Sequence, residues 1–531
     1  MGVRVGAARR RRGTAAGLFG AAVLVAGTVL GAGGAYAQPS PTPGGHSTPN
    51  GGNDDRDNQD EGHDGSTGRD GKKGDHGKDK GKSPTHRAEQ PGTGGSDAAG
   101  ARPAPAAGAV LATAETGPEV PVPTTQGLQQ ALAPLLADKN LGTVSIAVAD
   151  ASGGQLLYGT GENTASTPAS TTKIATSIAA LSLVPGDTRL TTRVVKGATP
   201  ASITLVGGGD PTLTALPADQ VQIGGRPTDA DTAPASLDDL ARQTAAALKA
   251  AGTTTVTLDY DLSLYTGNPL HKFHDDDTNI APVVPLMVDE GRVDPKSRED
   301  APKRVADPAA SAAEAFAGLL KAQGVTVEGR AKPAAAPAAA DAPVLGRVDS
   351  PTIARLVERA LTTSDNQLAE AIARQAAIAG HQPAGFEGAA TAVTQELTKL
   401  GVPMGGTTLN DGSGLNPGNA IAPVVLTRLL ALAASDQHPA LRPVLAGLPV
   451  AGFTGTLAKR YGPNSGAAEA AGLIRAKTGS LNNVNTLAGT VVDADGRLLA
   501  FAVMTRTTAP ADTARAALDR IAARLATCGC H

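Results

Sequence analysis

Apolar positions form regular patterns only from about residue 120 onwards. Residues 128–138 repeat apolar side chains at helical spacing, which predicts an amphipathic helix, and residues 143–150 and 155–161 have the pattern of a β-hairpin. Near the other end, residues 483–505 predict a second hairpin, and residues 514–526 predict a helix. We expect the two hairpins to share one antiparallel sheet, with the helices packed on it.

The middle of the chain changes pattern. Strand, helix and strand signals follow one another over residues 202–213, 237–252 and 254–265, and helical spacing dominates from Thr352 to Ala434. The predicted fold class is therefore α/β of the α+β type, an antiparallel sheet flanked by helices that carries a large insertion. The predicted limits are 122–189 with 349–531 for the sheet-and-helix domain and 190–348 for the inserted part.

Residues 1–37 have the features of an export signal. Arg4 and the run Arg9–Arg12 precede an apolar segment, and Ala35-Tyr36-Ala37 suits signal peptidase. The arginine pairs also suit twin-arginine export, and an uncleaved segment would anchor the chain in a membrane. We expect cleavage and an exported protein, extracellular or associated with the cell wall, that meets a membrane only through this segment if it stays uncleaved.

Residues 38–121 are predicted to be a disordered linker. They are rich in Gly, Pro and charged residues and hold few large apolar side chains, so burial cannot offset the loss of conformational entropy. The whole chain has a net charge of −3, with 47 Lys and Arg against 50 Asp and Glu, which gives no reason to expect a nucleic acid partner.

Only two cysteines are present, Cys528 and Cys530. Export permits a disulfide between them, and a C-x-C pair next to His531 also suits a metal ion, so both readings stay open here. No other motif in the chain requires a metal or a cofactor, and we expect neither in the function.

The stretch PASTTKIATSIAAL places Ser170 and Lys173 three positions apart at the start of an apolar helix. Residues i and i+3 share one face of a helix, so a hydroxyl and an amine lie side by side. An ordinary helix start also explains the pair, because Ser and Thr are favoured caps and a lysine in the next turn is usually solvated. The rest of the chain must decide between a nucleophile with its base and a cap.

Two further motifs favour the catalytic interpretation. Ser364-Asp365-Asn366 lies at a predicted helical break, and Lys477-Thr478-Gly479 lies directly before the closing hairpin, in a candidate edge strand. The order S-x-x-K, S-D-N and K-T-G is typical of class A β-lactamases and penicillin-binding proteins. Each motif alone is weak, but the three in order and in matching contexts are specific.

The chemistry explains the residue types. A serine hydroxyl needs a base to become a nucleophile, and Lys173 can serve if burial and the positive charge of Lys477 lower its pKa. Ser364 can pass a proton to the leaving amine, and Asn366 can orient Lys173 and bind a substrate carbonyl. We expect Thr478 and Ser480 to bind a substrate carboxylate, with Lys477 adding positive charge.

A histidine-based site is the competing interpretation. His271 and His274 lie in HKFHDDD, next to three aspartates, but the chain contains no G-x-S-x-G nucleophile elbow. We interpret this segment as a polar loop of the insertion rather than part of a triad or a metal site.

From residue 126 to residue 526 the sequence resembles the low-molecular-mass class C penicillin-binding proteins, the D-alanyl-D-alanine carboxypeptidase/endopeptidase family. The resemblance rests on the three motifs and on four further segments: GGGDPTL at 207–213, LNDGSGLN at 409–416, GTL at 455–457 and AKTGSLNNVNTLAGTVV at 476–492. It implies a penicilloyl-serine-transferase (β-lactamase-like) fold with a large insertion between the first two motifs. Two departures are Asp365 in the middle of S-x-N, where Asn is common, and the lack of Trp from Tyr260 to Asp277, where relatives often carry aromatic residues.

The resemblance also implies roles for individual residues. Ser170 is the acylated nucleophile, Lys173 its base, and Ser364 and Asn366 form the second element. The third element is Lys477, Thr478 and Gly479, and the oxyanion hole is formed by the N–H groups of Ser170 and Ser480. The implied substrates are peptidoglycan peptides, with β-lactam antibiotics as inhibitors.

The predicted function is a serine-type D-Ala-D-Ala carboxypeptidase or endopeptidase. A serine β-lactamase is the first alternative, but the insertion is long and no E-x-x-x-N lies between Ser364 and Lys477. A penicillin sensor without turnover is the second. The insertion offers a cluster of carboxylates, and we expect it to pair with a free amine of the stem peptide: Asp261, Asp275, Asp276 and Asp277.

Overall fold

The computed structural model describes residues 120–223, 226–273, 278–297, 299 and 301–531. The predicted signal segment, nearly all of the predicted linker, and the aspartates at 275–277 lie outside the described residues. Within them, Cys528 and Cys530 are joined in a disulfide.

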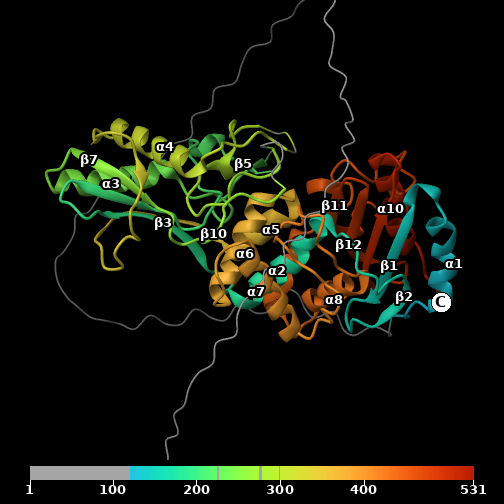
Figure 1. Ribbon diagram of the computed structural model, residues 1–531. Coiled ribbons are helices and arrows are strands. Elements are labelled where there is room, and N and C mark those ends of the chain that lie inside the picture. The colour runs from blue at the N-terminus through green and yellow to red at the C-terminus, as the bar shows by residue number, and fades with distance from the viewer. Residues whose placement is uncertain (1–119, 224–225, 274–277, 298, 300) are drawn as a thin grey trace, which may run out of the picture. The chain divides into compact units, whose positions relative to one another are not determined.

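An antiparallel sheet of five strands contains both hairpins, as predicted. β1 pairs with β13 in a register that sets Val148 opposite Phe501, so the opening and closing hairpins form one sheet (Figure 1). The strands in sheet order are β11 (Ile474–Leu481), β12 (Val484–Val492), β13 (Leu498–Arg506), β1 (Thr143–Asp150) and β2 (Leu156–Thr160). Among the described strands β11 pairs with β12 alone, and an isolated bridge joins Arg475 to Val450, so the K-T-G motif lies on an edge strand, as predicted.

Side chains of this sheet alternate between two helical layers, because successive residues of a strand point to opposite faces. Large side chains such as Phe501 pack under α1 and α10, whereas small ones such as Ala502 let α2 and α8 approach the other face. The helices of this part are α1 (Thr125–Leu136), α2 (Thr172–Leu183), α5 (Ile353–Thr363), α6 (Asn366–Ala379), α7 (Phe386–Lys399), α8 (Pro423–Ala434), α9 (Arg442–Gly447) and α10 (Ala511–Ala526).

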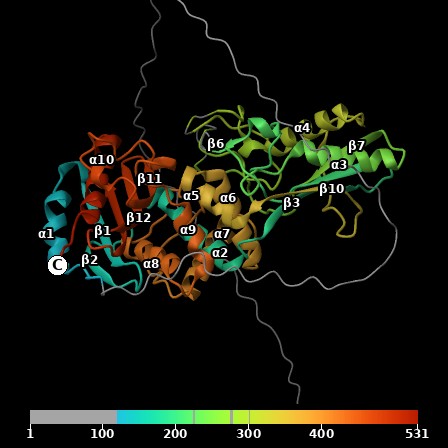
Figure 2. The same ribbon diagram turned by 180° about the vertical axis from the view of Figure 1, so that it is seen from behind.

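A second sheet lies between the first two motifs in the sequence. Its strands β10, β3 and β4 are antiparallel, β7 and β8 continue it in parallel, and β9 pairs with β7 (Figure 2). Phe316 and Leu240 lie in its buried core. Its elements, with a separate two-stranded ladder, are β3 (Arg189–Lys196), β4 (Ser202–Val206), β5 (Gln222–Ile223), β6 (Arg226–Pro227), α3 (Leu237–Ala250), β7 (Thr255–Asp261), α4 (Pro308–Ala322), β8 (Thr326–Val327), β9 (Lys332–Pro333) and β10 (Val344–Thr352). Strand β10 crosses residue 348, and the domain limits given above stay predictions.

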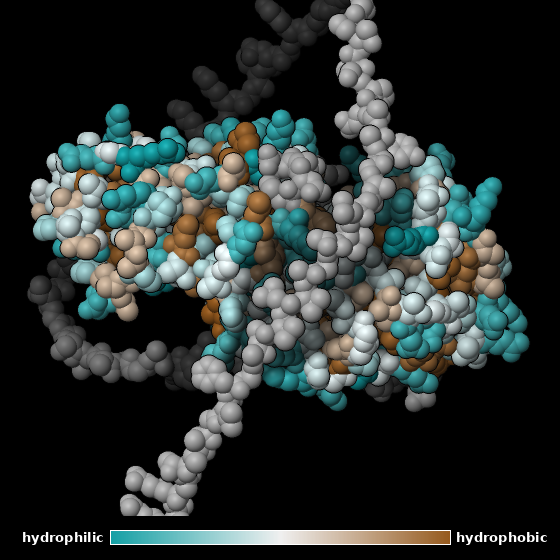
Figure 3. All heavy atoms as spheres, in the orientation of Figure 1, coloured by the Kyte–Doolittle hydropathy of each residue, from teal (hydrophilic) through white to brown (hydrophobic). Residues whose placement is uncertain are grey.

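The surface is mixed in character. On the face shown in Figure 3, hydrophobic residues are scattered among hydrophilic ones. In the described part of the chain, every helix is too short or too polar to span a bilayer.

Candidate active site

Ser170 lies in a short 3-10 turn, Ala169–Thr171, that leads directly into α2. The hydroxyls of Thr171 and Thr172 donate to the carbonyls of Pro168 and Ala169, and the α2 N-terminus has no side-chain cap. Ser170 is therefore not a helix cap, and its Oγ faces Lys173 instead. This excludes the ordinary helix-start interpretation of the S-x-x-K segment.

The turn that contains Ser170 requires a glycine in the segment that packs against it. Ala169 has a φ of 47°, an uncommon conformation for a residue with a side chain. Gly414, with φ of 86°, lies so close that a Cβ there would come within 2.0 Å of the Ala169 carbonyl oxygen. The DGSGLN segment thus packs directly against the turn that contains Ser170.

Lys173 is the buried centre of the site, with 1% of its surface exposed. Its Nζ lies 3.0 Å from Ser170 Oγ, 2.7 Å from Asn366 Oδ1 and 2.7 Å from the Ser413 carbonyl oxygen. The two carbonyl oxygens can only accept hydrogen bonds, so they take two N–H groups of the amine. In a neutral amine the remaining lone pair faces the Ser170 hydroxyl, which is the arrangement a general base needs.

Burial lowers the pKa of Lys173 from 10.5 to about 8. The carboxylates of Asp411, Asp365 and Glu370 act in the opposite direction and limit the fall. We expected burial and the positive charge of Lys477 to lower this pKa. Burial does so, but the charge of Lys477 does not contribute. The repulsion between the two lysines acts on Lys477, whose pKa burial and then Lys173 lower well below its ordinary value.

The second motif lies where α5 ends and α6 begins, at the predicted helical break. Ser364 adopts a left-handed conformation with φ of 60°, which turns the chain between the two helices. Its Oγ accepts a hydrogen bond of 2.8 Å from Lys477 Nζ. Ser364 is thereby joined to the third motif, while Asn366 is joined to Lys173.

Asp365, the departure from the common S-x-N pattern, has two structural partners. Its carboxylate caps α6 by accepting from the Leu368 N–H at 2.9 Å, and Arg292 Nη2 lies 3.7 Å from it. Burial alone would raise the pKa of Asp365, but Arg304 and Arg292 outweigh burial and lower the pKa to about 2. An aspartate fits here because the insertion supplies these arginines.

The third motif packs directly against the nucleophile turn. Thr486 Oγ1 donates to the Pro168 carbonyl at 2.8 Å, and a Cβ at Gly479 would come within 2.7 Å of the same oxygen. A larger residue at Gly479 would push β11 away from Ser170. The proximity suits an oxyanion hole formed by Ser170 and Ser480, although that assignment stays a prediction.

One open cleft of about 2170 Å³ joins these motifs. Its lining includes Ser170, Ser364, Asn366, Thr478, Ser480 and Arg515. Thr478 Oγ1 lies 2.8 Å from Thr456 Oγ1, and Arg515 Nη2 donates to Ser480 Oγ at 3.2 Å. The structure thus brings the three predicted motifs together, with the hydroxyl groups at the cleft and the two lysine amines beneath them.

Of the predicted carboxylate cluster, the structure describes only Asp261. Asp261 is buried at the end of β7, outside the lining of the cleft, and its two oxygens accept the N–H groups of Ser263 and Ala338, each at 2.8 Å. Its carboxylate stabilises a turn of the insertion and is not placed to meet a substrate amine. Asp275, Asp276 and Asp277 lie outside the described residues.

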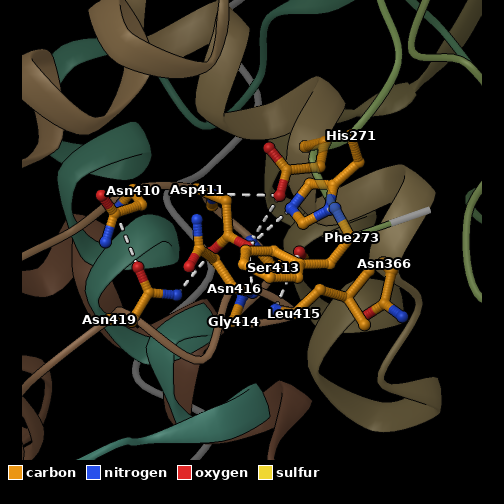
Figure 4. A network of polar contacts seen from close by, with 12 residues as sticks. His271, Phe273, Asn366, Asn410, Asp411, Ser413, Gly414, Leu415, Asn416 and Asn419 are labelled. Atoms are coloured by element: carbon orange, nitrogen blue, oxygen red, sulfur yellow. Dashed lines mark hydrogen bonds and ion pairs between the residues drawn. The ribbon is translucent and has the colours of Figure 1, made fainter. Parts of the chain in front are cut away.

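The interpretation of HKFHDDD as a polar loop was wrong for His271. This side chain is 3% exposed, and its Nε2 lies 2.9 Å from Asp411 Oδ2 (Figure 4). Asp411 and Ser413 belong to DGSGLN, which the sequence marked only by resemblance. A histidine beside three aspartates looks solvated, and its partner lies 140 positions away.

Among the described residues, His271, Glu370 and Asp411 form a group that could hold a metal ion, since one ligand atom of each lies within 4.8 Å of the others. Their existing hydrogen bonds disfavour a metal. His271 Nδ1 accepts from the Phe273 N–H, so Nε2 carries the proton toward Asp411. Asp411 Oδ2 already accepts from the Asn416 N–H at 2.7 Å.

The geometry defines a class: an active-site serine hydrolase of the penicillin-recognising fold. Consistent with it, the model of the "D-Ala-D-Ala carboxypeptidase 3 (S13)" family matches residues 128–303 and 296–525. The chain belongs to this family.

Individual relatives agree. The chain is 36% identical over 416 residues to Carboxypeptidase DacB of Mycolicibacterium smegmatis, which covers 77% of this chain and 86% of that one. It is 36% identical over 234 residues to a D-alanyl-D-alanine carboxypeptidase of an Actinomadura species, over 42% of this chain and 41% of that one. Penicillin binding protein 4 of Haemophilus influenzae has the same fold, with a TM-score of 0.59, 20% identity and coverage of 74% of this chain and 98% of that one.

We predict that acylation by a penicillin depends on pH through Lys173. The base must be unprotonated, and its pKa is about 8, so the rate should rise about tenfold per pH unit below that value and level off above it. The second-order rate constant for a fluorescent penicillin, measured from pH 6 to pH 10, tests this. A midpoint near 10.5, the ordinary value for lysine, contradicts the assignment.

Lys173→Arg supplies the matching variant. A guanidinium stays protonated, so the acylation rate should fall by at least ~100-fold at every pH. Its dependence on pH should no longer show the midpoint that the wild type has. Lys399→Arg, an exposed lysine on α7, is the control and should react as the wild type does. Acylation of Lys173→Arg near the wild-type rate shows that the base lies elsewhere.

Proposed function

We propose that this protein is a serine-type D-alanyl-D-alanine carboxypeptidase that hydrolyses the terminal D-Ala–D-Ala bond of peptidoglycan stem peptides through an acyl-enzyme on Ser170. The observation that carries the proposal is the contact of Ser170 Oγ with Lys173 Nζ at 3.0 Å, beside the Lys477–Ser364 pair, in one open cleft. Membership of the family and the named carboxypeptidases among the relatives support it.

Acylation uses both pairs. Ser170 Oγ attacks the carbonyl carbon of the penultimate D-Ala, and its proton passes to Lys173 Nζ. The backbone N–H groups of Ser170 and Ser480 stabilise the oxyanion. When the C–N bond breaks, Ser364, which accepts a hydrogen bond from Lys477, gives its proton to the amine of the departing D-Ala. The proton that Lys173 took from Ser170 replaces the one that Ser364 lost, so Lys173 is neutral again before deacylation.

Deacylation repeats the chemistry with water. Lys173 takes a proton from a water molecule, the resulting hydroxide attacks the ester carbonyl, and the Ser170 Oγ–carbon bond breaks with return of the proton to Oγ. A β-lactam acylates Ser170 by opening its ring, and its leaving amine stays tethered in the cleft. It therefore obstructs water and acts as an inhibitor. Peptidases that act on cross-links use the same two steps, so the endopeptidase reaction belongs to the same proposal.

Arg515 completes the recognition of the substrate carboxylate. Lys477 is buried and has a strongly lowered pKa, so in the free site it is a poor source of positive charge. The guanidinium of Arg515 lines the cleft, donates to Ser480 Oγ at 3.2 Å and stays charged. Thr478 and Ser480 would then supply hydrogen bonds to the carboxylate, and Arg515 the charge.

Two further parts of the proposal concern segments outside the described residues. Residues 1–37 would export the chain to the place where peptidoglycan is found, and the sequence pattern before Gln38 supports this. Asp275, Asp276 and Asp277 would pair with a free amine of the stem peptide. Equal hydrolysis of a free-amine peptide and its acetylated form would remove that role.

Ser170→Ala should abolish both penicillin labelling and release of D-Ala, because the attacking oxygen is lost. Mass spectrometry of the penicillin-treated wild type should place one penicilloyl adduct on Ser170. Incubation of wild type with muropeptides should release D-Ala, whereas rapid turnover of penicillin without D-Ala release indicates a β-lactamase. A labelled protein that turns over neither substrate indicates a sensor.

Arg515→Ala should lower kcat/KM about tenfold for a peptide that ends in a free carboxylate, because a charge-assisted hydrogen bond is lost. The same peptide with a terminal carboxamide should be affected much less. Arg524→Ala, an exposed arginine on the same helix, is the matched control. An equal loss for both peptides contradicts a role in carboxylate recognition.

A further inference from the structure

His271 comes from the inserted part of the chain, and its two contacts select one tautomer of the imidazole. Its Nδ1 accepts a hydrogen bond of 3.1 Å from the Phe273 N–H, so Nδ1 is unprotonated. Its Nε2 therefore carries the proton and donates to Asp411 Oδ2 at 2.9 Å. The ring packs edge-on against Phe386, with 5.2 Å between the ring centroids. The imidazole is thus a fixed donor aimed at a single carboxylate.

The Asp411 carboxylate organises the turn that contacts Lys173. Besides His271 it accepts three hydrogen bonds, from Gly414 N at 2.9 Å, Asn416 N at 2.7 Å and Asn419 Nδ2 at 2.6 Å (Figure 4). Glu370 Oε1 holds the same turn by accepting from Gly412 N at 3.1 Å and Ser413 N at 2.8 Å. With its N–H groups fixed by two buried carboxylates, the turn directs the Ser413 carbonyl to Lys173 Nζ at 2.7 Å.

The second acceptor of Lys173 is oriented from the same segment of the insertion. Asn366 Nδ2 donates to the backbone carbonyl of Asn279 at 3.2 Å. That bond sets the amide so that Oδ1 faces Lys173. Both carbonyl oxygens that hold the amine therefore depend on the insertion: Asn366 Oδ1 through Asn279, and Ser413 O through His271 and Asp411.

We infer that His271 is a positioning residue for the general base: it fixes the Asp411 carboxylate, and with it the turn whose Ser413 carbonyl sets the direction of the Lys173 amine. The inserted part of the chain is then required for acylation itself, independently of any contact with substrate. This inference rests on the proposed function, because it assigns His271 a role in the reaction of Ser170.

The charges around Lys173 predict the direction in which its pKa should change in a variant. Asp411, Asp365 and Glu370 raise the pKa of Lys173, whereas burial and Lys173 lower the pKa of the nearby Lys477 well below its ordinary value. Glu370 is itself 3.5 Å from Arg374, and Asp411 is paired with His271. Replacing Asp411 by Asn removes one negative charge, so the pKa of Lys173 should fall and the acylation profile should move to lower pH.

The test compares His271→Phe, His271→Gln and Asp411→Asn in the full chain, with His438→Gln as control, at a partly exposed site whose side chain caps no helix. The measurement is the acylation rate with a fluorescent penicillin from pH 6 to pH 10, after thermal unfolding confirms that each variant is folded. His271→Phe keeps a ring of similar size but loses the donor, and we expect a loss on the order of 10- to 100-fold with Ser170 still the labelled residue. His271→Gln keeps an N–H donor and should recover much of the rate.

Two results overturn the inference. One is wild-type acylation in His271→Phe. The other is an unshifted pH midpoint of acylation in folded Asp411→Asn, which would mean that the His271–Asp411 pair contributes to stability alone. If His271→Phe fails to fold, the Asp411→Asn result alone tests the inference. A wild type that is not labelled at Ser170 overturns the proposed function together with the inference. A labelled wild type that releases no D-Ala overturns only the proposed substrate.

Discussion

The burial of one amine sets the requirements that the rest of the site must meet. Lys173 is 1% exposed and has only neutral groups in direct contact. Removing an ammonium from water is costly, so the amine loses its proton readily and becomes a base. That holds only if its N–H groups still find acceptors. The S-D-N and DGSGLN segments supply one carbonyl oxygen each, and the remaining direction is left for Ser170.

The surrounding structure balances this loss of hydration with fixed charges. Asp411 and Glu370 accept hydrogen bonds from backbone N–H groups of the turn that contacts the amine, while Asp365 faces arginines of the insertion. Too little negative charge would leave Lys173 a weak base, and too much would leave almost none of it unprotonated at neutral pH. The compromise, a pKa of about 8, comes from elements that lie far apart in the sequence.

The sequence predicts those features that depend on local pattern. Helical spacing at Ser170 and Lys173, the break at Ser364 and the edge strand at Lys477 all follow from neighbouring residues. The structure also confirms that the two predicted hairpins share one antiparallel sheet. The contact of His271 with Asp411 could not be predicted, because no periodicity links residues 140 positions apart. Composition also misleads for Asp261, since an acidic residue can be buried when backbone N–H groups satisfy it.

The most direct test of this account is the titration of the Lys173 amine itself in the free protein. NMR of selectively isotope-labelled lysine side chains, with the signal assigned by its loss in Lys173→Arg, measures that pKa without substrate or inhibitor. The account predicts an apparent pKa of about 8 and a signal that responds to Asp411→Asn by moving to lower pH. A titration near the ordinary value of 10.5 would mean that almost no Lys173 is unprotonated at neutral pH, which would contradict its role as the base.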